Sequence, residues 1–372
     1  MNKGLVLSLL CSATLAGACV ASAAEKLVVG QSVELSGEAI GKENMLGARA
    51  YFSWLNAQGG IHGREVELRS YDDQRDPKKT LDNTERLLQQ EHAIALFGYR
   101  STPTVEAVLP LLQKEHVALV APFSGAAALH RPFNPYVFHL RASYWDEAGK
   151  MVESLSMLQI RKVAILHQDD AFGEDGLEGF QRSLTARNMH AAVVAKYSRK
   201  TLDVGPAADA IAAANPGAVL MACTPSACAD FVKRMHKKGL RPQFIMLSNV
   251  SSEHFFKSLG EDGRGIGVMQ VMPYPHDVGA SVTREFQRVL KTMGHPPPMS
   301  YAALEGFVAA KLLAEGLKRA GPHPSRQSLI DAMASMHDVD LGGVVVNYGP
   351  DDRDGSHFVE LTVVGKGGVF WR

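Results

Sequence analysis

One polar turn carries residue types that could bind a small anion. Residues 93–104 read Ala-Ile-Ala-Leu-Phe-Gly-Tyr-Arg-Ser-Thr-Pro-Thr, so an apolar run stops at Gly98 and hydroxyl residues precede a helical pattern near Pro103. At the carboxyl end of a parallel strand, this order places backbone N–H groups and short hydroxyls together at a helix start. The turn therefore predicts a cradle for a small polar or anionic ligand.

Alternating strands and helices must position this turn. Apolar strand candidates recur between helical patterns along most of the chain, and the alternation restarts after Arg141. Asp76, followed by Pro77, and Asp146 are expected to cap helices. Continuous apolar strands separated by helices predict an α/β fold with parallel sheets covered on both faces, here in two successive lobes. The main strand candidates are 27–33, 65–71, 93–97, 117–121, 162–167, 191–197, 218–222 and 243–247.

The first 24 residues have the three-part pattern of an export signal. Lys3 precedes an apolar stretch at 5–10, and Ala21-Ser22-Ala23-Ala24 offers small-residue cleavage sites. No later segment reaches 18 uninterrupted apolar residues, so we expect a soluble, exported chain. The alternative is a lipoprotein attached through Cys19, but the large aliphatic residue before that cysteine is misplaced for a lipid-attachment box.

Composition narrows the class of partner. Removal of residues 1–24 leaves 348 residues, a length that suits two lobes. Because Lys3 is the only charge removed, 38 basic residues stand against 39 acidic ones, a net charge of −1. Near-neutrality argues against nucleic acid or an anionic membrane as the main partner.

The sequence offers no catalytic or metal-binding constellation. The fourteen histidines form no His-x-x-x-His pair, and neither a Gly-x-Ser-x-Gly elbow nor a Walker lysine is present. We therefore expect no enzyme, no cofactor and no metal. Adjacent acids such as Asp72-Asp73 and Asp169-Asp170 are expected to serve turns and caps. After export, Cys223 and Cys228 remain, either as a small disulfide or as two buried thiols.

The order of motifs carries a family resemblance. Val33-Glu34-Leu35-Ser36-Gly37 precedes a helix that ends in Asn56-Ala57-Gln58-Gly59-Gly60-Ile61-His62-Gly63, and Tyr71-Asp72-Asp73 and Asp76-Pro77 follow. This joint pattern resembles the periplasmic leucine/isoleucine/valine-binding proteins, the type I solute-binding components of ABC importers. The resemblance covers essentially the whole exported chain.

The resemblance implies a fold and its division. It is the type I periplasmic binding protein fold, with two Rossmann-like lobes joined by three crossings and closing around a solute by hinge motion. Lobe 1 is expected at 25–142 plus 273–341, and lobe 2 at 143–272 plus 342–372. The protein is expected in the periplasm as a monomer that delivers a small molecule to a membrane permease.

The resemblance also assigns ligand contacts in lobe 1. The turns after the third and fourth strands would hold a carboxylate, and they match Ser101 and Thr102, then Phe123, Ser124 and Gly125. Hydroxyls and N–H groups at helix starts can stabilise a carboxylate. The alternative for the hydroxyls is ordinary helix capping. Ile40 would line the side-chain end of the ligand. Arg100 either forks onto a second carboxylate or is a solvated rim residue.

Lobe 2 departs from the family pattern. The covering tyrosine of the family matches Phe172, a second aromatic position matches Thr224, and the acid that pairs with the ligand ammonium matches Ser248. A buried ammonium without a carboxylate partner would be costly. The ligand is thus expected to be an amino acid or, fitting as well or better, an aromatic or aliphatic acid without an amino group. The alternative function is a sensor that presents ligand to a membrane kinase or chemoreceptor.

Overall fold

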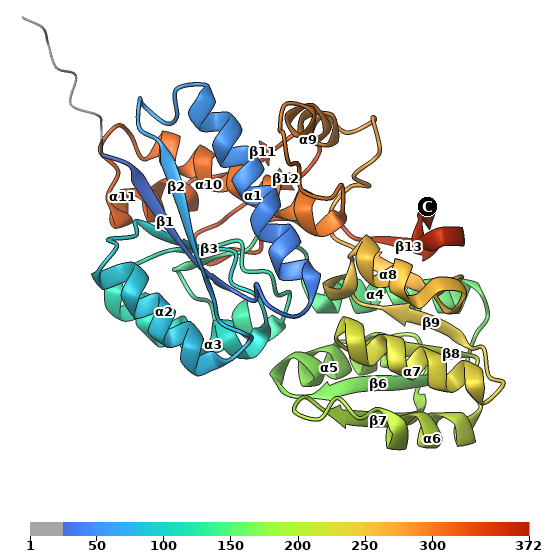
Figure 1. Ribbon diagram of the computed structural model, residues 1–372. Helices are drawn as coiled ribbons and strands as arrows, with labels where there is room; N and C mark the ends of the chain where they lie inside the picture. Colours follow the sequence, from blue (N-terminus) through green and yellow to red (C-terminus); the bar gives the residue numbers. More distant parts are fainter. Residues whose placement is uncertain (1–24, 372) are drawn as a thin grey trace, which may run out of the picture.

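Two α/β lobes make up the molecule in this computed structural model (Figure 1). The structure describes residues 25–371, apart from the side chains of Glu253 and His254. The predicted signal peptide at 1–24 lies outside the described residues. Within them, no helix is both long enough and apolar enough to cross a membrane.

The first lobe is built on a parallel five-stranded sheet of order β2-β1-β3-β4-β5. Helices α1 and α10 pack against each other at very short range, because Gly47 and Gly306 face backbone carbonyls of the opposite helix and leave no room for a Cβ atom. The strands are β1 (Leu27–Val33), β2 (Val66–Asp72), β3 (Ala95–Phe97), β4 (Leu119–Val120) and β5 (Val137–Phe138). The helices are α1 (Ala39–Ala57), α2 (Pro77–Gln89), α3 (Thr102–Glu115), η1 (Ala127–Leu129), α9 (Ser281–Lys291), α10 (Tyr301–Arg319) and α11 (Arg326–Ala334).

The second lobe has a seven-stranded sheet of order β14-β13-β10-β9-β8-β6-β7. Strands β6 to β10 pair in parallel, whereas β13 and β14 are antiparallel additions at one edge. The strands are β6 (Val163–Asp169), β7 (Ala191–Ser198), β8 (Ala218–Ala222), β9 (Gln243–Met246), β10 (Gly267–Gln270), β13 (Glu360–Val364) and β14 (Phe370–Trp371). The helices are α4 (Tyr144–Met157), α5 (Ala171–Thr185), α6 (Gly205–Ala214), α7 (Pro225–Lys237), η2 (Ser248–Val250), α8 (Glu253–Leu259), η3 (Gly260–Gly263) and η4 (Lys366–Gly368).

The parallel strands of both lobes have one shared order. In each lobe the second strand lies outside the first, and the third, fourth and fifth follow on the other side. In such doubly wound sheets a ligand binds beyond the carboxyl ends of the strands, where the strand order reverses. The switch point lies between β1 and β3 in the first lobe and between β6 and β8 in the second. The turns after these four strands should therefore form the site.

The chain passes between the lobes three times, as the resemblance implies. It leaves the first sheet after β5, returns after β10, and crosses again between β12 (Val345–Val346) and β13. Strand β12 pairs with β11 (Val339–Asp340), and the backbone at 353–356 hydrogen-bonds to His139 and Leu140 beyond β5. This part of the tail thus contacts the first lobe before β13 joins the second sheet. The predicted lobe boundaries themselves stay a prediction.

Most predicted elements are present, with shifted ends. Asp76 caps α2 as predicted, its carboxylate accepting the Lys78 N–H at 2.8 Å. The predicted cap at Asp146 is wrong: Ser143 caps α4, and Asp146 is the third helical residue of a capping box that bonds back to Ser143. Ser143 is the cap because its short side chain reaches the unpaired N–H groups at the start of the helix. Helices α8, α9 and α11 were not predicted from the sequence.

Candidate ligand-binding site

A cavity lies where the strand ends of the two lobes meet. It is narrow: of about 310 Å³ of space between the atoms, open solvent included, only about 20 Å³ is wide enough for the centre of a water molecule. Turns of both sheets and the start of α4 contribute to its wall. The lining residues are Arg75, Arg100, Ser101, Thr102, Phe123, Tyr144, Phe172, Thr224 and Asn249.

The turn after β3 has an uncommon backbone. Gly98 has φ +59°, and a Cβ there would lie 2.8 Å from Gln31. Ser101 has φ +85°, a region that L residues rarely occupy, and its side chain makes no cap hydrogen bond to α3. Such strain is held in place by surrounding structure and often marks a functional turn. The alternative of ordinary capping is therefore wrong for Ser101.

Thr102 is tied to the next turn. It is only 1% exposed, and its hydroxyl shares a 2.8 Å hydrogen bond with the Ser124 hydroxyl. Ser124 and Gly125 are buried and do not line the cavity. They support the cavity wall through Thr102, while Phe123 presents its ring to the cavity from the same turn.

Arg100 is buried and paired. It is 5% exposed, and its guanidinium donates to Glu34 and, at 3.3 Å, to Glu38. The alternative of a solvated rim arginine is therefore wrong. Burial raises the pKa of Glu34, and the charge of Arg100 opposes that rise.

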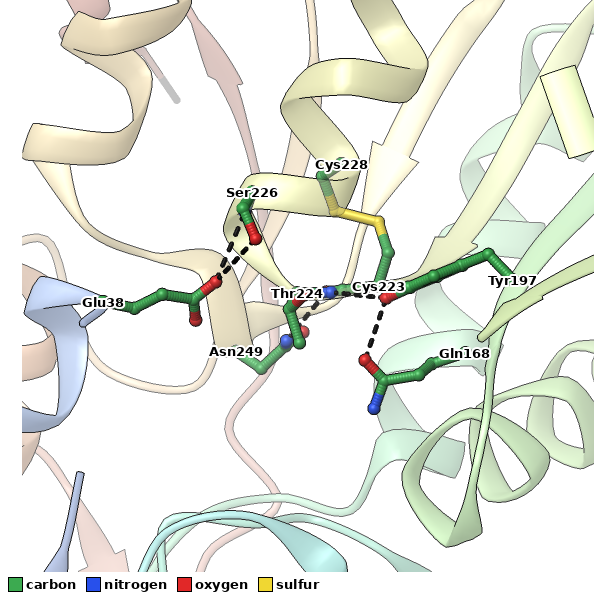
Figure 2. The surroundings of a disulfide bond; sticks show 8 residues. All are labelled: Glu38, Gln168, Tyr197, Cys223, Thr224, Ser226, Cys228 and Asn249. Carbon is green, nitrogen blue, oxygen red and sulfur yellow. Dashed lines mark hydrogen bonds between the residues drawn. A yellow bond between two sulfur atoms is a disulfide. The ribbon is translucent and has the colours of Figure 1, made fainter. Parts of the chain in front are cut away.

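The turn after β8 mirrors the turn after β3 and carries a disulfide. Cys223 and Cys228 are bonded, with Cα atoms 5.6 Å apart, and close the turn over Thr224 (Figure 2). Thr224 donates its N–H to the Tyr197 hydroxyl at 3.1 Å. Its own hydroxyl lies beside that of Tyr197 but does not reach hydrogen-bond geometry with any described residue. The Thr224 hydroxyl is thus available at the cavity wall.

Asn249 adds a second available polar atom. Its amide nitrogen donates to the Cys223 carbonyl at 2.9 Å, which leaves the side-chain oxygen buried without a partner among the described residues (Figure 2). Nearby, the rings of Phe172 and Tyr144 pack edge to face, with centroids 5.4 Å apart. Lobe 2 therefore offers a ring face and two neutral polar atoms.

Ser248, predicted as a ligand contact, lies behind the cavity. Its N–H and hydroxyl both donate to the Glu147 carboxylate at 2.7 Å, and its hydroxyl oxygen accepts from Arg141. Arg141 is 1% exposed and lies 4.7 Å from the Phe123 ring centroid. Burial raises the pKa of Glu147 to about 7, and the nearby charge of Arg141 works against that rise. Ser248 instead lines a small buried cavity beside Glu305.

The structure thus brings five of the nine predicted ligand residues to one cavity. These are Ser101, Thr102, Phe123, Phe172 and Thr224. Ile40 instead lines a neighbouring cavity with Phe255. The ligand role of all nine stays a prediction.

Sequence reasoning missed Arg75, Tyr144 and Asn249. Asn249 lies three residues past the end of β9, in the turn after a predicted strand, and that position was a signal that could have found it. Tyr144 begins the first helix after a crossing, and Arg75 follows Asp72-Asp73, a motif interpreted only as turn chemistry. No group of three His, Cys, Asp or Glu side chains suited to a metal occurs in the part of the chain that the structure describes.

Comparison with known proteins identifies the family. The model of the family described as "periplasmic binding protein" matches residues 26–368. The chain belongs to this family. A substrate-binding periplasmic protein from Ralstonia solanacearum is 35% identical, with a TM-score of 0.88 over 93% of this chain and 99% of that one.

More distant relatives agree on the fold. The Leu/Ile/Val-binding protein of Escherichia coli is 21% identical over 275 residues, which are 70% of this chain and 73% of that protein. An ABC transporter solute-binding protein of R. palustris, solved with benzoate, is 21% identical with a TM-score of 0.80, over 93% of this chain and 95% of its own. The predicted family and the two-lobed α/β fold are therefore confirmed. Members of this family are binding proteins and not enzymes.

Proposed function

We propose that this periplasmic binding protein captures a small carboxylic acid without an α-amino group and delivers it to the permease of an ABC importer. The Ser101–Thr102 turn would hold the carboxylate, and the rings of Phe123 and Phe172 would pack on the ligand body. The Thr224 hydroxyl would donate or accept a neutral hydrogen bond, and the Asn249 side-chain oxygen would accept one. Export by the predicted signal peptide would place the protein in the periplasm.

The observation that carries this proposal is the charge of the cavity wall. Two arginines line it, and no aspartate or glutamate among the described residues does. The position matched to the acidic residue of amino-acid binders is Ser248, which is already engaged by Glu147 and Arg141. An ammonium buried here would have no carboxylate partner, which is costly.

The relatives support both the proposed class of ligand and the proposed permease partner. They include a Leu/Ile/Val-binding protein and a benzoate complex, so the fold accommodates carboxylates with and without an amino group. The relatives' association with ABC transporters motivates the permease as partner.

The test compares ligands that differ only in the amino group. The chain without the predicted signal peptide, stripped of bound solute by unfolding and refolding, is titrated calorimetrically with leucine and with isocaproate, its skeleton without the amino group. Phenylalanine and phenylpropanoate form a second pair, and benzoate is included. We expect the amine-free acid to bind about tenfold more tightly or better in at least one pair. Equal or tighter binding of the amino acids, or no binding of any acid, would overturn the proposal.

Two serine variants test whether the acid binds at the predicted site or elsewhere on the surface. Ser101→Ala should weaken the binding of the acid, whereas Ser154→Ala, on α4 and outside the cavity lining, should not. Loss of affinity in both variants, or in neither, would place the ligand elsewhere.

A further inference from the structure

Three arginines and three acids meet at the mouth of the cavity. Arg75, Arg100 and Arg199 follow strands β2, β3 and β7, and Glu34, Glu38 and Asp170 follow β1 and β6. Arg199 bridges the lobes, since its guanidinium donates to the Arg75 carbonyl at 2.7 Å and reaches the Ser101 hydroxyl at 3.4 Å. The turns that carry Arg75 and Ser101 therefore lie within the span of a single guanidinium.

The three carboxylates are already occupied. Glu34 accepts from Arg100 and from the Glu38 N–H, and Asp170 accepts from Arg199 at 2.6 Å. Glu38 accepts from Arg100 at 3.3 Å and, across the lobes, from the N–H and hydroxyl of Ser226 (Figure 2). Each carboxylate of the cluster thus accepts a hydrogen bond from a donor other than Arg75.

Arg75 has an ion-pair partner, Glu38, but no hydrogen-bond partner for its side chain among the described residues. The closest Glu38 carboxylate oxygen is 3.8 Å away. The Nε atom is buried, and the residue lines the cavity. Burial, and after it the charge of Arg100, lowers the pKa of Arg75, while the charges of Glu38 and Glu34 offset part of that shift, so its positive charge is only partly compensated. A guanidinium in this state is suited to a carboxylate, which it can bind with two parallel hydrogen bonds.

The backbone holds Arg75 in this position. Gln74 and Arg75 both have left-handed φ values, +52° and +60°. The buried carboxylate of Asp73 accepts the Arg75 N–H at 2.9 Å and is itself held by Ser32 and Thr80. Two successive residues in this region are strained, and strain of this kind persists where surrounding contacts fix it. The turn thus presents Arg75 to the cavity and does not leave it in solvent.

We propose that Arg75 forms a second anion subsite and that the solute is a short diacid, with one carboxylate on the Ser101–Thr102 turn and the other on Arg75. This inference rests on the proposed function and adds the class of solute. The first carboxylate is held by hydroxyls and by N–H groups at the start of α3, so it leaves the Arg75 guanidinium for the second.

The experiment compares a monoacid, a diacid and a half-ester built on the same carbon chain. Pentanoate, glutarate and monomethyl glutarate are titrated calorimetrically into the signal-free chain, and benzoate is compared with isophthalate and terephthalate. We expect a diacid to bind about 10- to 100-fold more tightly than its monoacid, and the half-ester to behave like the monoacid. Equal affinity of monoacid and diacid would overturn the subsite while leaving the proposed function intact. Failure of every acid to bind would overturn both.

A matched pair of variants assigns the effect to Arg75. Arg75→Gln should weaken the binding of the diacid far more than that of the monoacid and so remove the advantage of the diacid, and Arg75→Lys should restore part of it. The exposed Arg161 gives the control, since Arg161→Gln should leave both affinities unchanged. Because the Arg75 side chain makes no hydrogen bond to the described chain, the variants should keep the wild-type melting temperature. A diacid advantage that survives Arg75→Gln in a folded protein would overturn the inference.

Discussion

Both lobes have a Thr-Pro dipeptide beside the cavity, but the two threonine hydroxyls differ in their hydrogen bonds. Thr102-Pro103 begins α3 after β3, and Thr224-Pro225 begins α7 after β8, at equivalent places in sheets of equal strand order. Both threonines are buried, at 1% and 2% exposed. The Thr102 hydroxyl is held by Ser124, whereas the Thr224 hydroxyl has no hydrogen-bond partner among the described residues.

The difference extends to how each turn is fixed. The lobe 1 turn is anchored by polar contacts and lies beside two arginines, and the lobe 2 turn is closed by the Cys223–Cys228 disulfide. Lobe 1 thus supplies charge from a pre-arranged network, and lobe 2 supplies a ring face and neutral groups. Preorganised charge is suited to first capture of an anion, and the neutral face is suited to closing over it.

The largest expected effect is on the lobe 1 threonine. Thr102→Val keeps the shape of the side chain but removes the hydroxyl that would meet a carboxylate. A hydrogen bond to a charged group contributes about 1.5–3 kcal/mol, so the dissociation constant of the acid found by titration should rise about 10- to 100-fold. Thr104→Val is the control, because that buried hydroxyl bonds to the Ser101 carbonyl at 2.8 Å and does not line the cavity. Equal losses in both variants would mean a structural effect only.

The next expected effect is on the covalent closure of the lobe 2 turn. Cys223→Ala combined with Cys228→Ala opens a loop of six residues, for which the chain-entropy model gives a loss of about 2 kcal/mol in the free energy of unfolding. Urea denaturation followed by circular dichroism measures this loss against oxidised wild type, and wild type in reductant should match the double variant. An unchanged free energy would show that the Tyr197 and Asn249 contacts alone hold the turn.

Much of the fold and part of the site could be predicted from sequence. Apolar runs and the turns after them locate the strand ends, and a doubly wound sheet must bring those ends to one edge. Ser101, Thr102 and Thr224 reach the cavity for that reason. The Asp72-Asp73 motif was interpreted correctly as turn chemistry, since Asp72 accepts the Leu35 N–H and Asp73 the Arg75 N–H.

The remainder depends on contacts that no local pattern encodes. Arg75 lines the cavity only because Asp73 fixes a left-handed turn. Ser248 faces away from the cavity because its hydroxyl is hydrogen-bonded to Arg141 and to Glu147. Arg141 lies at a crossing between the lobes, and Glu147 lies on α4. Both facts require knowing which segments meet across more than 40 residues of sequence. The family motif therefore predicted the region of the fold in which Ser248 lies but not the residues that its side chain contacts.

A smaller effect is expected for the lobe 2 threonine. Thr224→Val removes a hydroxyl that bonds to no described residue, so the free energy of unfolding should change little. A neutral hydrogen bond to the ligand contributes about 0.5–1.5 kcal/mol, which predicts a loss of affinity of about 2- to 13-fold, below that of Thr102→Val. Calorimetric titration of both variants with the same acid compares them directly. A larger loss for Thr224→Val would reverse the proposed division between the charged and neutral faces.

The smallest expected effect concerns the contact that joins the two lobes behind the cavity. Asp175, on α5, accepts the Ala127 N–H of η1 at 2.7 Å, and burial raises the pKa of its carboxyl to about 7. Because this pKa lies above that of the unfolded chain, the folded protein binds the proton more firmly. The resulting stability is complete below about pH 4 and is lost as the pH rises through about 7.

Wild type should therefore melt at a lower temperature at pH 8 than at pH 5, and Asp175→Asn should reduce this slope. The asparagine keeps an acceptor for the Ala127 N–H without the charge. We expect the difference in slope to amount to about 2–4 °C, equivalent to about 1 kcal/mol, and part of the slope should remain because burial also raises the pKa of Glu147 to about 7. The exposed Asp82 provides the control, since Asp82→Asn should leave the slope unchanged. If Asp175→Asn and Asp82→Asn gave the same slope as wild type, the contact between Asp175 and Ala127 would carry no proton-dependent stability.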